Sequence, residues 1–161
     1  MGALVKAERP PEQYLTFMLG GEVFALGILA IKEIIEYDHL TQVPGMPDFI
    51  RGVINLRGAV VPVIDLSSRF GRPATVAGRR TCIVIVEVAT ASESQVIGVM
   101  VDAVNEVLDI PGTDIEPAPS FGARIRVEFI LGMGKVEGRF VIILNADKVL
   151  SVDEMTVLAA A

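Results

Sequence analysis

The sequence predicts a mainly β protein made of two small β-barrels that share an apolar core. Hydrophobic residues make up 52% of the 161-residue chain, yet they come in short bursts separated by glycine, proline and charged residues. Such bursts are typical of buried strands joined by turns. A second observation, an internal repeat, indicates that the strands form two similar units.

Two pairs of segments carry the repeat. Residues 49–65 align without a gap on residues 129–145 at an offset of 80, and phenylalanine, isoleucine and glycine residues coincide. Residues 23–36 align on residues 96–109 at an offset of 73. The offsets differ because the second half carries a longer loop, in a stretch rich in proline and glycine.

The repeat divides residues 13–150 into approximate halves, 13–72 and 79–150. Each half carries about five strands, and a sheet of that size buries too little apolar surface to be stable alone. We therefore expect two barrels packed on one another, and an exchange of strands at the seam stays open. Four aliphatic stretches should dominate the core, at residues 60–64, 83–86, 96–101 and 140–144.

The strands follow one another closely after a polar lead-in at residues 1–12. Gly20 and Gly21 mark the turn of a first hairpin, because glycine accepts the backbone angles that tight hairpin turns require. We expect about ten strands, at residues 13–19, 22–27, 33–37, 51–57, 59–66, 81–88, 95–104, 105–110, 132–138 and 139–145.

Three short helices complete the prediction. Asp65 and Asn145 each end a strand, and both residue types are good N-caps for a helix. Ser151 and Glu154 have the spacing of a capping box, so a C-terminal helix is expected over residues 151–161. Its apolar face would consist of Val152, Met155 and Leu158.

Composition excludes several classes of protein. The net charge of −6 disfavours nucleic-acid binding, which requires a positive surface. No apolar run reaches the length of a membrane helix, and the N-terminus lacks the apolar core of a secretory signal. A lone cysteine, Cys82, cannot form an intramolecular disulfide. These features favour a cytoplasmic protein that does not insert into the membrane.

Catalytic chemistry finds little support in the sequence. The single histidine, His39, has no cysteine or histidine companion that would complete a metal site. Asp65 and Asp102 follow buried strands, but an N-cap and a strand-end charge explain them better than a pair of catalytic carboxylates. No nucleophile elbow or phosphate-binding loop is present. We expect a binding protein that is not an enzyme and holds no cofactor and no metal.

The best candidate for binding is the hairpin turn at Arg57 and Gly58, together with Glu33. A solvated charge at a turn would also explain Arg57, and an outward-facing charge would explain Glu33. However, the repeat places Glu137 where the first half has Arg57, so the fold does not require arginine there. Arginine is enriched at interface hot spots because its planar head pairs well with carboxylates.

These motifs resemble the CheW family, the coupling proteins of bacterial chemotaxis. The most specific stretch is "FIRGVINLRGAVVPVIDL", residues 49–66. It is followed in order by "VIGVMVDAVNEVLDI" at residues 96–110 and by "FILGMGKVEGRFVIILN" at residues 129–145. The resemblance covers essentially residues 13–160.

The resemblance implies two five-stranded, SH3-like barrels around a shared core and a non-catalytic adaptor. Its partners would be the cytoplasmic tips of chemoreceptors and the regulatory domain of the histidine kinase CheA, in arrays beneath the inner membrane. The chain itself is expected to be monomeric or weakly self-associating. An adaptor of a non-flagellar chemosensory array and a small ligand-binding β-barrel are the alternatives.

The resemblance also implies where the partners bind. Receptor contacts would fall in a groove between the barrels, where an acidic or carbonyl group of the partner would complete Arg57. Gly52 and Gly98 match glycines that maintain the geometry of the barrels. The expected partner-binding residues are Ile31, Glu33, Arg57, Gly58, Val104 and Val107.

Overall fold

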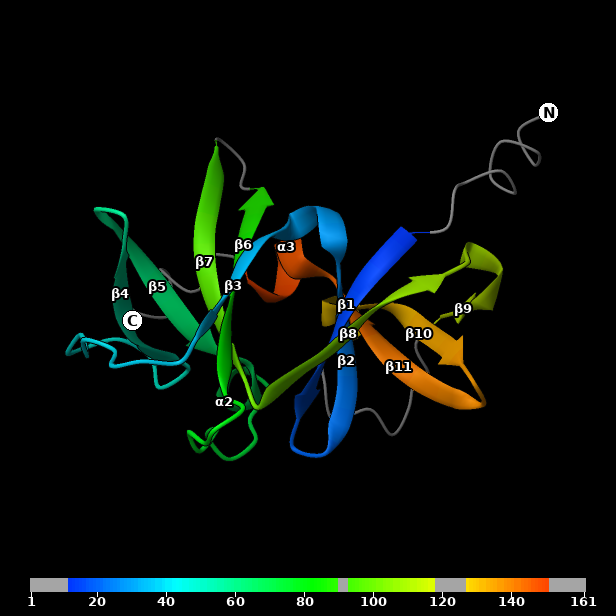
Figure 1. Ribbon diagram of the computed structural model, residues 1–161, viewed down its shortest axis with the longest axis horizontal. Helices are drawn as coiled ribbons and strands as arrows, with labels where there is room; N and C mark the ends of the chain where they lie inside the picture. The colour runs from blue at the N-terminus through cyan, green and yellow to red at the C-terminus, as the bar shows by residue number, and fades with distance from the viewer. Residues whose placement is uncertain (1–11, 90–92, 118–126, 151–161) are drawn as a thin grey trace.

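The computed structural model describes residues 12–89, 93–117 and 127–150, which form two curved mixed β-sheets side by side (Figure 1). The five-stranded sheet has the order β3 (Ile31–Glu36), β6 (Cys82–Ala89), β7 (Ser94–Val101), β5 (Ala59–Asp65) and β4 (Ile50–Leu56). The six-stranded sheet has the order β8 (Ala103–Ile110), β1 (Glu12–Leu19), β2 (Glu22–Gly27), β11 (Arg139–Leu144), β10 (Ile130–Val136) and β9 (Ile115–Glu116).

Each sheet takes strands from both halves of the sequence. In the five-stranded sheet, β3 of the first half pairs with β6 of the second half, and in the six-stranded sheet, β8 of the second half pairs with β1 of the first half. In addition, β5 pairs in parallel with β7, and β11 pairs in parallel with β2. Both sheets therefore combine strands of the two sequence halves.

Short helices join these strands. Three are 3-10 turns: η1 (Ile28–Ala30), which leads from β2 into β3, η2 (Gly112–Asp114) and η3 (Val127–Phe129). The other two, α2 (Leu66–Arg69) and α3 (Ala146–Val149), directly follow β5 and β11. The helix expected over residues 151–161 and residues 1–11 of the expected lead-in lie outside the described residues, while Glu12, the last residue of that lead-in, belongs to β1.

The repeat appears in the structure as two closely similar hairpins, β4–β5 and β10–β11. Both first strands carry an irregularity after their first residue, at Ile50 and Ile130. Both turns have a non-glycine residue in the left-handed region, Arg57 with φ 53° and Glu137 with φ 49°. Each of these is followed by a glycine of positive φ, so the two turns share one backbone geometry.

The largest apolar cluster lies between the two sheets, as the sequence predicted. Val84, Val99 and Ile64 of the five-stranded sheet meet Phe17 and Phe24 of the six-stranded sheet in this cluster. Each sheet also has one smaller apolar cluster of its own. The predicted aliphatic stretches supply much of the core, but the fully buried phenylalanines of the first hairpin contribute to it as well.

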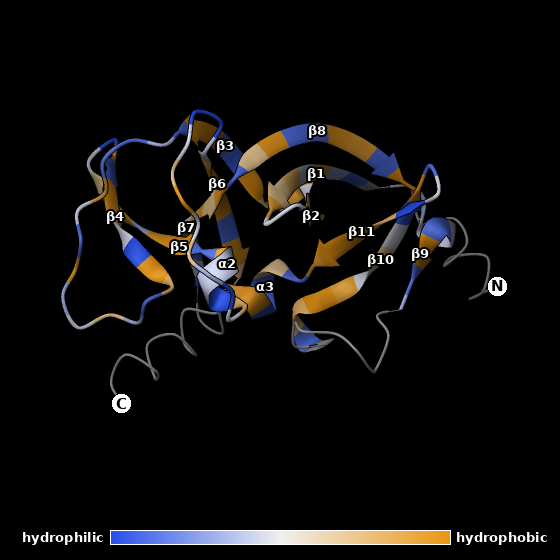
Figure 2. Cartoon of the chain, turned by 90° about the horizontal axis from the view of Figure 1, so that it is seen from below, coloured by the Kyte–Doolittle hydropathy of each residue, from blue (hydrophilic) through white to orange (hydrophobic). Residues whose placement is uncertain are grey.

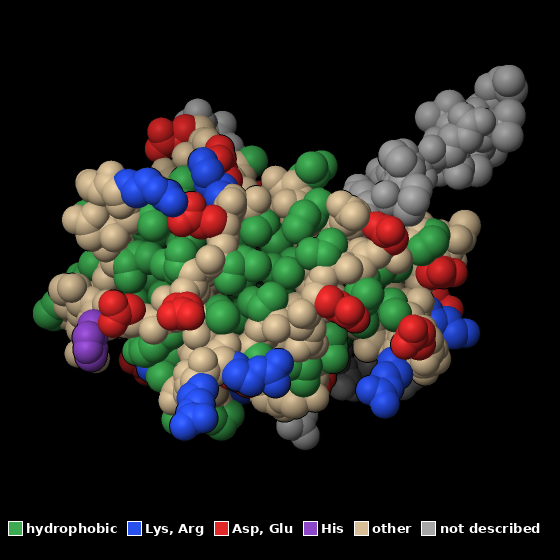
Figure 3. Space-filling view, in the orientation of Figure 1, with side chains coloured by type: hydrophobic (Ala, Val, Ile, Leu, Met, Phe, Trp, Pro, Cys, Tyr) green, Lys and Arg blue, Asp and Glu red, His purple; other side chains and the backbone are tan. Residues whose placement is uncertain are grey.

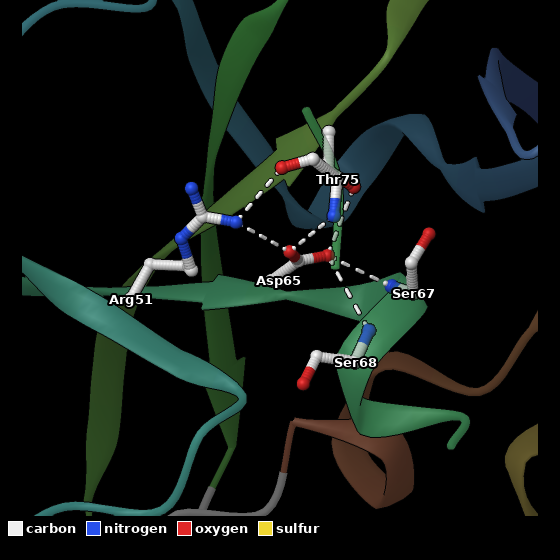
Figure 4. A network of polar contacts seen from close by, with 5 residues as sticks. All are labelled: Arg51, Asp65, Ser67, Ser68 and Thr75. Atoms are coloured by element: carbon white, nitrogen blue, oxygen red, sulfur yellow. Dashed lines mark hydrogen bonds and ion pairs between the residues drawn. The ribbon is translucent and has the colours of Figure 1, made fainter. Parts of the chain in front are cut away.

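Asp65 anchors the end of β5 through a buried network (Figure 4). Its Oδ1 accepts hydrogen bonds from the backbone N–H groups of Ser67 (3.0 Å) and Ser68 (3.4 Å) and from the hydroxyl of Thr75 (2.9 Å). Its Oδ2 accepts from the Thr75 N–H (2.8 Å) and from Arg51 Nη1 (2.9 Å). The predicted N-cap is confirmed, and the same carboxylate fixes the loop that follows α2.

The second half lacks this network. Asn145 occupies the N-cap position of α3, but its side chain makes no capping hydrogen bond, contrary to the role expected for it. Leu131 stands where the first half has Arg51 and is 61% exposed. A further difference from the prediction is β9, a strand of only two residues, which was not expected.

Candidate functional site

The structure brings Arg57 and Glu33 together in an exposed ion pair. Arg57 Nη2 donates to Glu33 Oε2 at 2.8 Å and to Oε1 at 3.1 Å. The side chain of Arg57 is 73% exposed and that of Glu33 is 28% exposed. A pair so open to water adds little to stability, so most of the guanidinium stays available to a further acceptor. The carboxylate that completes one side of Arg57 therefore belongs to the same chain.

The turn that carries Arg57 is held by its own sequence. The side-chain oxygen of Asn55 accepts a hydrogen bond from the N–H of Gly58 at 2.9 Å. Gly58 has φ 88°, which glycine adopts without strain. The amide and the glycine thus fix the geometry of the turn, and Arg57 is presented from a rigid hairpin.

The repeat shows that this ion pair is not required by the fold. Glu106 is the counterpart of Glu33 at the offset of 73, and Glu137 is the counterpart of Arg57 at the offset of 80. The second half thus has two acidic residues where the first half has an acid and a base. The same hairpin geometry forms with either residue at the turn, so the backbone of the turn does not require arginine.

A cavity of about 160 Å³ opens beside the ion pair. Leu56, Val61, Ile85 and Val96 supply apolar lining, and Lys32, Glu33, Arg57 and Ala59 complete it. It lies in the five-stranded sheet, between β3 and the turn of the β4–β5 hairpin. Its size and lining suit an apolar side chain better than a polar metabolite.

The remaining predicted contact residues lie on the two crossing strands, β3 and β8. Ile31 and Val104 are partly buried and pack against the shared core. Val107 is 46% exposed, and its counterpart in the repeat, Ile34, is 43% exposed. Both strands lie on the same face of the molecule in two perpendicular views (Figures 1 and 2).

On this face, hydrophobic side chains form a band across the middle of the molecule (Figure 3). Carboxylates are seen on both sides of the band, and Glu36, Glu106 and Asp109 are exposed acidic residues of β3 and β8. We call Ile31, Ile34, Val104 and Val107 the seam band. Ile34 was not among the residues expected from the sequence, although its offset from Val107 would have indicated it.

Two glycines leave no room for a side chain. A Cβ atom at Gly52 would lie 2.6 Å from the backbone oxygen of Thr41, which bridges to Val53 beside it. A Cβ atom at Gly98 would lie 2.8 Å from Cγ2 of Ile83. Both contacts are too close for a carbon atom, so the close approach of neighbouring strands requires glycine at these positions.

Charges elsewhere on β3 are also paired. Lys32 Nζ donates to Glu87 Oε2 at 3.1 Å. The hydrogen bond from Lys32 is the largest cause that lowers the pKa of Glu87 below its ordinary value, followed by a hydrogen bond from Ser94. The edge of β3 nearest the cavity thus carries two ion pairs, Lys32–Glu87 and Glu33–Arg57.

Within residues 12–89, 93–117 and 127–150, no group of three or more histidine, cysteine, aspartate or glutamate residues is arranged to hold a metal ion. None of the helices in the same part of the chain is long and apolar enough to cross a membrane.

Comparison with known proteins extends the resemblance over almost the whole chain. A model of the family described as the CheW-like domain matches residues 13–154. The chain is 35% identical over 147 residues to the chemotaxis protein CheW of Klebsiella aerogenes, covering 91% of this chain and 86% of that protein. It is 34% identical over 142 residues to the chemotaxis protein CheW of Rhizobium meliloti, with coverage of 88% and 89%.

A solved structure shows the same fold. The crystal structure of the scaffolding protein TtCheW from Thermoanaerobacter tengcongensis matches with a TM-score of 0.78 and 34% sequence identity. The match covers 89% of this chain and 90% of that one, so both sheets have counterparts there.

Proposed function

The chain belongs to the CheW-like domain family, and on that premise we propose that it is a non-catalytic adaptor of a chemotaxis array. In this role it joins the cytoplasmic tips of chemoreceptors to the regulatory domain of the histidine kinase CheA. It acts in the cytoplasm, beneath the membrane in which the receptors are anchored. The observation that carries the proposal is the family match over residues 13–154.

We propose that the receptor tip binds the seam band and the hairpin turn beside it. The residues concerned are Ile31, Glu33, Arg57, Gly58, Val104 and Val107. Support comes from the position of β3 and β8 on one face of the molecule, from the exposed apolar surface of Val107 and from the free side of the Arg57 guanidinium. A few residues near the centre of an interface contribute most of its affinity, and arginine is enriched among them.

The pairing of Arg57 with Glu33 changes one detail of the expected mechanism. An acidic group of the partner need not neutralise a lone arginine, because Glu33 already contacts one nitrogen of its guanidinium. A partner carboxylate or carbonyl can still approach the other nitrogens, and the ion pair holds the side chain in position. Because the Arg57 side chain is already held in place, it loses less conformational entropy when a partner binds.

The test is a binding experiment with the full chain and two purified fragments, a receptor tip and the regulatory domain of CheA. The proposal predicts that the chain binds each fragment separately and holds both in one three-component complex. Size-exclusion chromatography with light scattering would detect the complex, and calorimetry would give the affinities. Failure to bind either fragment, or competition between them for one surface, would contradict the adaptor function.

A further inference from the structure

Leu29 is the most exposed large hydrophobic side chain of the described residues, at 95% exposure. It belongs to η1, where the chain crosses from the six-stranded to the five-stranded sheet, and Ile31 of the seam band follows two residues later. Isolated exposed hydrophobic residues are common and need no explanation. Leu29 differs because it adjoins further partly exposed apolar residues.

The backbone holds Leu29 in a fixed position. Its neighbour Ile28 and Ile31 pack against the shared core, which anchors both ends of the turn. The N–H of Ile31 bonds to the carbonyl of Ile28, which closes the turn around Leu29. The turn contacts both β1 and β6, one strand from each sheet. The leucine is therefore presented to solvent by a rigid element at the seam.

The repeat provides an internal comparison. At the offset of 73, the counterpart of Leu29 is Asp102, at the second crossing between the sheets. Asp102 has a structural task, because its Oδ2 accepts a hydrogen bond from the N–H of Gly20 at 2.8 Å. The crossing thus does not require leucine, and at 95% exposure Leu29 buries almost none of its own surface.

From these observations we propose that Leu29 is an anchor residue of the receptor-binding surface, inserted into an apolar recess of the receptor tip. The proposal rests on the adaptor function proposed above. Leu29 is continuous with that surface, because Ile31 follows it by two residues at the same crossing. Strands β3 and β8 also expose the carboxylates of Glu36, Glu106 and Asp109, so the part of the receptor tip that faces these strands should carry lysine or arginine side chains. Leucine fits such a recess because a projecting apolar side chain gains affinity without forming hydrogen bonds.

The experiment compares Leu29→Ala with a matched control, Val76→Ala, in the full chain. Val76 is also a highly exposed apolar residue, at 87%, but it lies in the loop between α2 and β6. Affinities for the receptor-tip fragment and for the CheA regulatory domain would be measured together with the thermal midpoint. A third variant, Leu29→Asp, introduces the residue type that the repeat has at the counterpart position, Asp102.

We expect Leu29→Ala to weaken receptor-tip binding about tenfold or more, since burial of a leucine side chain provides free energy of that order. Leu29→Asp should weaken it further, because it would place a charged carboxylate in an apolar recess. Binding to CheA and the midpoint should stay unchanged in both variants, and Val76→Ala should behave as wild type throughout.

Three results would overturn the inference. Wild-type affinity of Leu29→Ala for the receptor tip would show that Leu29 is not an anchor. Loss of CheA binding alone would show that the occupant is the kinase, and a lowered midpoint with loss of both partners would show a structural role. These results differ from failure of the adaptor function itself, in which the wild-type chain would bind no receptor tip.

Discussion

Replacement of Asp65 by alanine should strongly destabilise the protein. The carboxylate is fully buried and accepts five hydrogen bonds from Ser67, Ser68, Thr75 and Arg51. Alanine would leave the buried N–H groups of Ser67 and Thr75 without an acceptor. Each unsatisfied buried donor costs about 1–3 kcal/mol. The Arg51 guanidinium would also lose its ion-pair partner, although its 27% exposure allows water to replace part of that interaction.

These terms give a loss of about 3–5 kcal/mol in the free energy of unfolding, the range seen when a buried pair is broken. For a chain of this size, a change of that magnitude lowers the thermal midpoint by about 10 °C. Asp65→Asn should be intermediate, because an amide offers one oxygen where the network uses two. Thr75→Ala removes one hydroxyl bond and should cost about 1 kcal/mol.

Urea denaturation followed by circular dichroism would measure these differences. Asp102→Ala is a suitable control, because that carboxylate accepts one exposed hydrogen bond and should contribute less than about 1 kcal/mol. If Asp65→Ala lost no more stability than Asp102→Ala, the burial and saturation of the Asp65 carboxylate would not be a determinant of stability, and the reasoning would be refuted.

Two further predictions concern packing and charge. Gly98→Ala should destabilise the fold by about 1–3 kcal/mol, because its Cβ would lie 2.8 Å from a branched methyl group of Ile83 that cannot move freely. Thermal denaturation of the variant would test this, and an unchanged midpoint would contradict it. Lys32→Ala should raise the pKa of Glu87 towards its ordinary value, because the bond from Lys32 is the largest cause of its lowering. A carboxyl titration by NMR would measure this shift. Since the pKa is lowered in the folded state, the contribution of the pair to stability is present at neutral pH and is lost as the pH falls through that lowered pKa.

Much of the fold could be predicted from the sequence because its signals are local. Alternating and continuous apolar stretches identify the strands, and glycines at fixed offsets identify the two repeated hairpins. The shared core follows from the small size of each half. The two-residue strand β9 could not be predicted, since so short a segment carries no periodicity and forms only through its pairing with β10.

The candidate site was predictable in its composition but not in its geometry. The family resemblance indicated Arg57 and Glu33, yet nothing in the sequence shows that residues 24 positions apart form an ion pair. That contact depends on β3 crossing into the sheet that holds the β4–β5 hairpin. The exposure of Leu29 could not be predicted from the sequence either, because an apolar residue between two strands is expected to be buried.

The left-handed backbone at Arg57 could not be predicted from the sequence. The turn has positive φ at both Arg57 and Gly58, although only glycine adopts such angles without strain. The Asn55 side chain that bonds to Gly58 was the available signal, because asparagine commonly stabilises such turns.

The measurement that tests the central claim most directly is the behaviour of Arg57→Glu. The account predicts a thermal midpoint close to that of the wild type, because the side chain is 73% exposed and Glu137 adopts the same backbone angles in the second half. It predicts about a thirtyfold loss of affinity for the receptor tip, with binding to the CheA regulatory domain retained. A collapsed midpoint would show that Arg57 is structural. An unchanged midpoint with both affinities unchanged would show that the surface around Arg57 is not the receptor site.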